Sequence, residues 1–278
     1  MNINGKTKLF GILGNPVTHS LSPTMHNACF RSLGINGVYV PLPSTDAKQA
    51  IRGMRNLGVA GASVTYPFKE EVIGHLDEVD RLARQIGAVN TIVFSPGEDG
   101  RRTAKGYNTD WQGSNRALES TLELKGKIAL VLGAGGAAKA VGFGLKAAGA
   151  EVIICNRTVK NGVDLAKWLD CGFVASEELD MVRADILINT TSVGMEPYPR
   201  DIPINPRILD RFETVMDIVY APLTTRLLEE AATRGCRTID GLAMLLHQGA
   251  AQFEIWTGQR PEVAVMRRAM LEALEYRR

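Results

Sequence analysis

Short runs of apolar residues alternate with longer amphipathic segments along almost the whole chain. Runs of this length, rich in Val and Ile and bounded by Gly, Pro or Asn, are typical of buried strands. They predict strands at residues 9–13, 38–42, 60–64, 88–94, 128–132, 151–155, 186–190 and 215–219. Between them, apolar residues recur at helical spacing, as in the helix expected over residues 223–234. This alternation predicts βαβ units, an α/β fold and largely parallel sheets.

Two changes of pattern divide the chain into domains. Residues 96–100 read PGEDG, a strong turn signal that predicts the tip of a hairpin. We therefore expect a first domain over residues 1–105 and a second over residues 106–241, which has its own strand-helix-strand pattern from Lys127 onward. The remaining residues, 242–278, are predicted to be helical.

Composition narrows the class of protein. The chain has 278 residues, 45% of them hydrophobic, which suits two globular domains. Its 32 basic and 30 acidic residues nearly balance, which argues against a general nucleic-acid binder. The four cysteines form no CxxC pair and have no zinc-ligand spacing, so neither a metal site nor a disulfide framework is expected. No signal peptide and no apolar run of about 18 residues is visible, so we expect a cytoplasmic protein without a membrane partner.

A glycine-rich motif follows the predicted strand at residues 128–132. It fits GxGxxA and comprises Gly133, Ala134, Gly135, Gly136, Ala137 and Ala138. In dinucleotide-binding units the first glycine permits a tight turn, the second lets the backbone approach the pyrophosphate, and the helix N-terminus offers N–H groups to it. A plain glycine-rich turn is the alternative. A strand before the motif and a helix after it favour the dinucleotide site.

The end of the next predicted strand indicates which dinucleotide is bound. NAD-binding units usually place Asp or Glu there, about 20 residues after the glycines, to hold the ribose 2′-OH. This chain instead has Asn156, Arg157 and Thr158, with Lys160 nearby. Arginine and lysine can bind a 2′-phosphate. Solvated surface cations are the alternative, but their position after the glycines favours NADP.

Several further motifs occur in one order between residues 9 and 256. They are GNPVTHSLSP (14–23), SVTYPFK (63–69), GAVNT (87–91), GYNTD (106–110), the GAGGAA run (133–138), NRT (156–158), NTTSVGM (189–195), DIVY (217–220) and GLAMLLHQ (241–248). With these motifs the chain resembles the shikimate dehydrogenase family. The resemblance implies a substrate-binding α/β domain, a Rossmann domain for NADP, a cleft between them, and C-terminal helices that pack back on the first domain. It also implies NADPH-dependent, reversible reduction of 3-dehydroshikimate to shikimate in aromatic amino-acid biosynthesis.

The resemblance implies roles for polar residues in the first domain. Ser20 and Ser22 would bind the substrate carboxylate, and two loop hydroxyls before a helix can both point at one anion. The alternative for Ser22 is an ordinary helix N-cap. By resemblance, the ring hydroxyls would be contacted by Thr65, Asn90 and Gln248. A strand-end amide that orders a loop is the alternative for Asn90.

By resemblance, Lys69 and Asp110 carry the chemistry. Hydride transfer to a ketone leaves an alkoxide that must be protonated, and the reverse reaction needs a base. Lys69 is assigned as this general acid/base and Asp110 as the carboxylate that orients it. Burial lowers a lysine pKa whereas a neighbouring carboxylate raises it, so the sequence does not decide how protons are distributed between Lys69 and Asp110. Taken alone, Lys69 before two glutamates would be an ordinary surface lysine.

The nicotinamide side is assigned by resemblance to Ile218, Tyr220 and Gly241. Gly241 would let the backbone approach the carboxamide, although a simple glycine at a helix start is the alternative. Tyr220 would lie near both substrate and nicotinamide, although a lone tyrosine is often packing. The family usually has Asn where this chain has Ser63. Either Ser63 reaches the same partners through water or the site is looser, and we expect that Ser63→Asn leaves activity intact or raises it.

Two rival functions use the same scaffold. A quinate or dual-specificity dehydrogenase often varies at the second serine and often uses NAD with an acidic residue after the second Rossmann strand. Ser22 and Arg157 therefore favour shikimate and NADP. A non-catalytic NADP-binding sensor would be marked by loss of Lys69 or Asp110, and both are present. Monomer and homodimer remain equally open.

Overall fold

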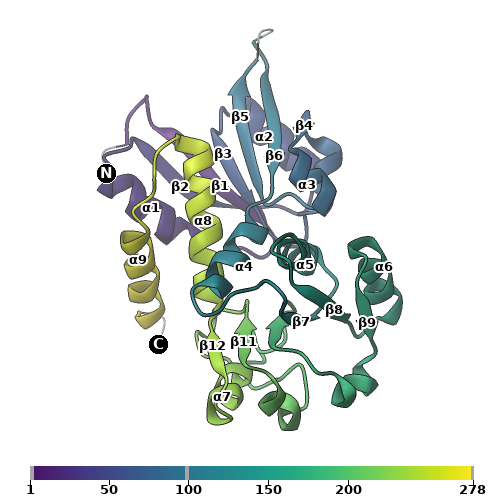
Figure 1. Ribbon diagram of the computed structural model, residues 1–278. Coiled ribbons are helices and arrows are strands. Elements are labelled where there is room, and N and C mark those ends of the chain that lie inside the picture. The colour runs from purple at the N-terminus through teal and green to yellow at the C-terminus, as the bar shows by residue number, and fades with distance from the viewer. Residues whose placement is uncertain (1–2, 98–99, 277–278) are drawn as a thin grey trace. The chain divides into compact units, whose positions relative to one another are not determined.

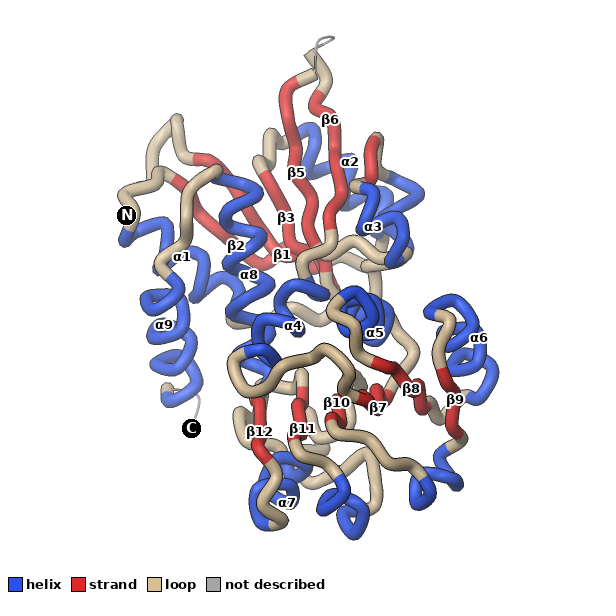
Figure 2. The backbone as a smooth tube through the Cα atoms, viewed as in Figure 1, coloured by secondary structure: helices blue, strands red, loops and turns tan. Residues whose placement is uncertain are grey.

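The computed structural model describes residues 3–97 and 100–276 and divides the chain into two compact units. The first unit comprises residues 1–109 and 248–278, and the second comprises residues 110–247. Each unit is built around its own β-sheet with helices packed on it (Figures 1 and 2). The α/β class predicted from the alternation of apolar runs and helical segments is confirmed.

The sheet of the first unit has the order β2-β1-β3-β5-β6-β4. Its strands are β1 (Lys8–Gly14), β2 (Gly37–Pro43), β3 (Gly61–Val64), β4 (Glu78–Val79), β5 (Thr91–Pro96) and β6 (Arg102–Tyr107). β1 is parallel to β2 and β3, whereas β5 is antiparallel to β3 and β6. The sheet is thus mixed rather than largely parallel, because only antiparallel strands can be joined by a tight hairpin such as that between β5 and β6. Glu98 and Asp99, at the expected hairpin tip, lie outside the described residues.

Helices from both ends of the chain cover this sheet. They are α1 (Ser22–Ser32), α2 (Ala47–Asn56), α3 (Arg81–Ile86), the 3₁₀ helix η1 (Glu71–His75), the second part of α8 (Gly241–Thr257) and α9 (Val263–Glu275). α9 packs on α1, so the C-terminal helices return to the first unit as expected (Figure 1). An aromatic cluster of Phe10, Phe30, Tyr39, Phe253 and Trp256 joins strands and helices in its core.

The second unit is a parallel six-stranded sheet of order β12-β11-β10-β7-β8-β9. Its strands are β7 (Ile128–Leu132), β8 (Glu151–Cys155), β9 (Gly172–Val174), β10 (Ile186–Asn189), β11 (Thr214–Asp217) and β12 (Arg237–Ile239). Its helices are α4 (Asp110–Glu119), α5 (Gly136–Ala147), α6 (Val159–Leu169), α7 (Arg226–Thr233), η2 (Ser176–Met181), η3 (Pro206–Arg211) and the start of α8. The strand order reverses between β7 and β10, which is where Rossmann sheets bind ligands beyond the carboxyl ends of the strands.

Burial explains why β7 is apolar throughout. Ala129 and Val131 belong to one hydrophobic core, and Leu130 and Leu132 belong to another. Successive side chains of a strand point to opposite faces, so both faces of this central strand are covered. The continuous run of apolar residues in the sequence follows directly from this position.

Several predicted boundaries shift in the structure. The strand expected from residue 88 begins at Thr91, and the last strand expected over residues 215–219 ends at Asp217. The helix expected from residue 223 begins at Arg226, because the Thr225 hydroxyl accepts a hydrogen bond from Leu228 N (3.4 Å) and caps it. The short strands β4, β6, β9 and β12 were not predicted.

Neither a membrane-spanning helix nor a metal-binding cluster is found among the described residues. No helix within residues 3–97 and 100–276 is long and apolar enough to cross a membrane. Over the same residues, no group of three His, Cys, Asp or Glu side chains is arranged to hold a metal ion.

Candidate substrate and cofactor sites

The loops that follow β1 and β3 contact each other at one edge of the first sheet. Asn15 N donates to Tyr66 O (3.0 Å), and Thr65 N donates to Leu13 O (2.9 Å). A Cβ on Gly14 would lie 2.3 Å from Cγ2 of Thr65, so glycine allows this close approach. The loop that leads to Ser20 and the loop that begins with Thr65 therefore start side by side.

The two serines lie at the start of α1. The N-cap residue is Leu21, which has no side-chain acceptor, and Pro23 lies in the first turn. The alternative that Ser22 is the N-cap is therefore wrong. Ser20 Oγ instead accepts from Ser22 N (3.2 Å), while Ser22 itself is only 3% exposed. A helix start that lacks a side-chain cap can offer its N–H groups and both hydroxyls to an anion.

Asn90 lies at the centre of a buried polar cluster in the first unit. Its Nδ2 donates to Thr109 Oγ1 (2.9 Å) and to Gln248 Oε1 (3.3 Å). Its Oδ1 accepts from Thr109 N (2.8 Å) and from Thr91 Oγ1 (2.7 Å). The structure thus brings together Asn90 and Gln248, two residues assigned to the ring hydroxyls. Asn90 also orders the segment that ends at Thr109, as the alternative interpretation expected.

Lys69 is half-buried in a turn held on both sides by backbone hydrogen bonds. Phe68 N donates to Thr65 O (3.0 Å), and the Phe68 ring is 3% exposed. The Lys69 carbonyl accepts from Val89 N (2.7 Å), one residue before Asn90. The backbone of Lys69 is therefore fixed beside the Asn90 cluster. Asp110, the next residue after Thr109, is 4% exposed and begins α4 in the second unit.

The glycine motif has the geometry of a phosphate-binding turn. Gly133 has a φ of +116°, a conformation that L side chains rarely adopt. Gly135 occupies the N-cap of α5, which has no side-chain cap, and nothing in the protein lies within 4 Å of a Cβ placed there. Ala138 is fully buried where α5 packs on the sheet. The start of α5 therefore has space and N–H groups for a pyrophosphate, and the residues present fit a dinucleotide.

The loop after β8 lies next to this motif. Gly133 N donates to Cys155 O (2.8 Å), the last residue of β8. Asn156 Nδ2 donates to Thr158 O (2.9 Å) and shapes the turn. Arg157 and Lys160 are exposed, which suits two cations available to a phosphate.

Sequence reasoning missed a buried carboxylate at the end of β11, Asp217. Asp217 accepts from Asn189 Nδ2 (2.9 Å), Val219 N (3.0 Å) and Thr225 Oγ1 (2.7 Å). Burial raises the pKa of the Asp217 carboxyl to about 6, although these hydrogen bonds act in the opposite direction. The cluster ties the loop after β10 to the loop after β11, which carries Ile218 and Tyr220. Polar residues at the ends of two apolar runs were its signal in the sequence.

Gly241 lies against the backbone of the loop after β11. A Cβ at this position would lie 2.3 Å from Ile218 O and 2.6 Å from Val219 O. The glycine therefore lets the start of α8 approach the loop of Ile218, a neighbour within the chain.

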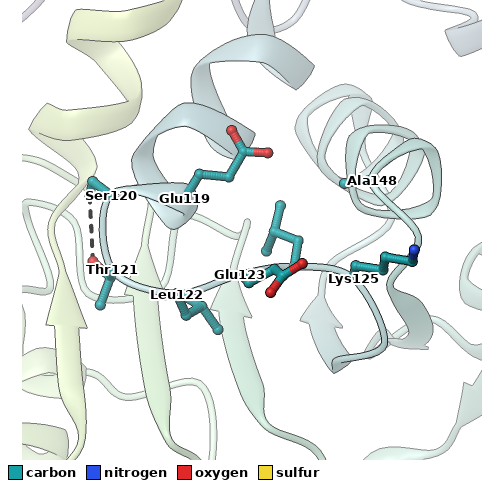
Figure 3. Close-up of a pocket in the computed structure, with 8 residues that line it drawn as sticks. Glu119, Ser120, Thr121, Leu122, Glu123, Lys125 and Ala148 are labelled. Carbon is teal, nitrogen blue, oxygen red and sulfur yellow. Dashed lines mark hydrogen bonds between the residues drawn. The ribbon is translucent and has the colours of Figure 1, made fainter.

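A separate hollow at the end of α4, lined by residues 119–125 and Ala148, contains none of the predicted site residues (Figure 3).

The assigned residues are divided between the two units. Those in the first are Ser20, Ser22, Thr65, Lys69, Asn90 and Gln248. Those in the second are Asp110, residues 133–137, Asn156, Arg157, Thr158, Lys160, Ile218, Tyr220 and Gly241. A Rossmann unit with an open glycine turn, together with a first unit that holds a buried polar cluster, is typical of dinucleotide-dependent oxidoreductases.

Comparison with known proteins gives the family. Residues 12–92 match the model of the shikimate dehydrogenase substrate binding domain. Residues 115–196 match that of shikimate/quinate 5-dehydrogenase, and residues 241–271 match that of the shikimate 5′-dehydrogenase C-terminal domain. The chain belongs to the shikimate dehydrogenase family.

Individual relatives match over nearly their full length. A Pyrococcus furiosus protein named shikimate dehydrogenase (NADP(+)) is 46% identical, with 99% of this chain and 100% of the relative covered. The crystal structure of shikimate 5-dehydrogenase from Thermus thermophilus in complex with NADP(H) and shikimate has a TM-score of 0.86 at 39% identity, covering 96% and 100% of the two chains. Quinate dehydrogenase from Corynebacterium glutamicum in complex with NAD also has a TM-score of 0.86, at 30% identity, covering 96% and 99%.

Proposed function

We propose that the protein is an NADP-dependent shikimate dehydrogenase that interconverts 3-dehydroshikimate and shikimate in aromatic amino-acid biosynthesis. The observation that carries this proposal is the buried pairing of Asn90 with Gln248, beside the fixed backbone of Lys69. This arrangement places side-chain amides, which suit a small polyhydroxylated ring, beside the turn that carries Lys69. On this proposal the protein binds small molecules rather than nucleic acid or a membrane. It acts in the cytoplasm, as a monomer or a homodimer.

The domains predicted from the sequence have separate tasks in this proposal. Substrate binding belongs to residues 1–105 together with the helices of residues 242–278, and NADP binding belongs to residues 106–241. Bound NADPH supplies the hydride. The turn at residues 133–137 binds the pyrophosphate, Asn156 to Thr158 with Lys160 bind the adenosine 2′-phosphate, and Ile218 with Gly241 border the nicotinamide. These roles are supported by the uncapped start of α5 and the exposed cations after β8.

The substrate residues act by position and proton transfer. Ser20 and Ser22 bind the carboxylate, while Thr65, Asn90 and Gln248 contact the ring hydroxyls and Tyr220 lies near the reacting carbon. As the carbonyl oxygen gains negative charge, the Lys69 ammonium donates a proton to it, and in the reverse direction neutral Lys69 accepts the hydroxyl proton. Asp110 orients the Lys69 amine and accepts from a substrate hydroxyl.

Quinate is the second candidate substrate, because a quinate dehydrogenase shares the fold at a TM-score of 0.86. Quinate has an additional hydroxyl at the ring carbon that bears the carboxylate, so it needs more room near Ser20 and Ser22. Members that act on quinate often vary at the second serine, and this chain has Ser22, which favours shikimate. Arg157 further favours NADP over NAD.

Substitution of Lys69 tests the proposal. Wild-type enzyme should form NADPH from NADP and shikimate, as followed by absorbance. Lys69→Met should lower kcat by about 10²- to 10⁴-fold, the usual contribution of general acid–base catalysis. It should leave the NADP Kd unchanged, because Lys69 lies outside the Rossmann unit. Lys48→Met, an exposed lysine in α2, is the matched control and should be unaltered. Near-normal turnover in Lys69→Met would overturn the assignment.

A further inference from the structure

Side chains on one face of α8 contact β3 and the residues around the start of β5. Gln248, Gln252 and Trp256 recur every four residues along the helix, a step of about 6 Å. On β3, Gly61 and Ser63 point to the same face, and two residues of a strand advance by about 6.6 Å. Because the two steps nearly match, successive helix side chains can meet successive strand positions.

The contacts follow this register. Trp256 Nε1 donates to Ile92 O (3.0 Å) and covers Gly61, where a Cβ would lie 2.5 Å from the indole. Four residues earlier on the helix, Gln252 Nε2 donates to Asn90 O (3.0 Å). The two donors thus reach carbonyls two residues apart, that of Asn90 just before β5 and that of Ile92 within it. Four residues earlier again, Gln248 Oε1 accepts from the Asn90 side chain (3.3 Å).

Gln252 is itself held by a buried chain of hydrogen bonds. Tyr39 OH donates to Ser63 Oγ (2.7 Å), and Ser63 Oγ donates to Gln252 Oε1 (2.7 Å). Tyr39 and Gln252 are each 1% exposed, and Ser63 is 5% exposed. Because the amide oxygen of Gln252 accepts from Ser63, its NH₂ group is the end directed at Asn90 O. These hydrogen bonds fix both the position and the orientation of the Gln252 amide.

We propose that Gln252 and Ser63 are positioning residues that hold Asn90 and Gln248 in place for the substrate. This proposal deepens the proposed function and rests on it, since the substrate contacts of Asn90 and Gln248 belong to that function. Gln252 binds the Asn90 carbonyl, and the Asn90 side chain in turn donates to Gln248, one helical turn before Gln252 on α8. Ser63 acts through Gln252 and is committed to partners within the protein.

This role reverses the expectation for Ser63. An asparagine at position 63 has two more heavy atoms than serine, and the site between Tyr39 and Gln252 is buried. Overpacking of a buried site displaces its neighbours. Ser63→Asn should therefore raise the shikimate KM rather than leave activity intact.

Steady-state kinetics with shikimate and NADP test the proposal. Gln252→Met keeps the length of the side chain but removes its hydrogen bonds, and it should raise the shikimate KM about tenfold, the effect of losing buried hydrogen bonds. The NADP KM should stay unchanged and kcat should change less than the shikimate KM. Ser63→Ala should raise the same KM, and the double variant should be no worse than Gln252→Met because both break one chain. Gln259→Met, exposed beyond the end of α8, is the matched control.

Two results would overturn the proposal: an unchanged shikimate KM in Gln252→Met, or Ser63 and Gln252 effects that multiply independently. If wild-type enzyme does not oxidise shikimate, the proposed function fails, and a crystal structure of Gln252→Met then decides the positioning role alone. Separation of Asn90 Nδ2 from Gln248 Oε1 beyond hydrogen-bond distance supports that role. Retention of the 3.3 Å contact overturns it.

Discussion

Gly241→Ala tests how the start of α8 is fitted to the loop after β11. A Cβ at this position would lie 2.3 Å from Ile218 O, 2.5 Å from Ile218 C and 2.6 Å from Val219 O. Favourable carbon contacts are about 3.5–4.0 Å, so the overlap is roughly 1 Å. All three atoms belong to the backbone, so no change of rotamer can relieve it.

The magnitude follows from the cost of overpacking. Insertion of a carbon into a filled site costs about 1–3 kcal/mol. We expect a loss near the upper end of that range, about 3 kcal/mol, because the obstruction is backbone. The displaced residue is Ile218, which the proposed function places at the nicotinamide. Gly241→Ala should therefore also weaken NADP binding.

The assay compares this variant with Gly53→Ala, a change of the same chemistry. Gly53 lies within α2, and nothing is within 4 Å of a Cβ placed there. Because alanine is the better helix former, Gly53→Ala should stabilise the protein by about 0.5–1 kcal/mol. Urea unfolding, followed by Trp fluorescence and circular dichroism, gives both free energies, and coincident transitions support a two-state analysis. A Gly241→Ala variant as stable as wild type, with unchanged NADP affinity, would refute the reasoning.

Two further predictions concern the cofactor and the buried core. Arg157→Ala should raise the NADP KM roughly tenfold and leave the NAD KM nearly unchanged, because only NADP has the 2′-phosphate; equal changes for both cofactors would contradict the assignment. Burial lowers the pKa of His26 to about 3, whereas its unfolded-state pKa is 6.5. As pH falls below about 6.5 the unfolded state therefore binds a proton that the folded state excludes, and this residue should remove about 2 kcal/mol of stability by pH 5. The pKa of Asp217 is raised to about 6 in the folded state, so its protonation at lower pH stabilises the fold and partly offsets the effect of His26. The effect of His26 is therefore isolated by comparing the urea unfolding of wild type with that of His26→Phe, at pH 7.5 and at about pH 5. The stability difference between the two proteins should shift in favour of His26→Phe at the lower pH, and a constant difference would count against a neutral buried His26.

The Rossmann half was the more predictable part of the fold. The bounds of β7 and β8 agree with the apolar runs at residues 128–132 and 151–155. Both strands are internal to a parallel sheet, where burial on both faces leaves an uninterrupted apolar run. β6 reads RTAKGY, and its buried Ala104 and Gly106 alternate with charged and polar residues. Such a strand is stabilised by its pairing with β5, which the sequence pattern does not display.

The candidate site, like the fold, could be predicted only in part. Residue types at motif positions could be identified in the sequence, but the direction of a side chain could not. Ser63 is the clearest case, since its partners are Tyr39, 24 residues earlier, and Gln252, 189 residues later. Gly241 is another, because its contact with the backbone of Ile218, 23 residues earlier, could not be seen in the sequence. Contacts between residues so far apart in sequence are decided by the packing of α8, which local patterns do not encode.

Oxidation of shikimate with NADP is the activity on which the proposed roles of all these residues depend. The most direct measurement is kcat/KM for four combinations, shikimate or quinate with NADP or NAD. We predict that shikimate with NADP exceeds each other combination by at least about 100-fold, as expected when buried polar groups and a phosphate site discriminate between ligands. Comparable or higher values for quinate or NAD would contradict this prediction, as would tight NADP binding without turnover of either acid.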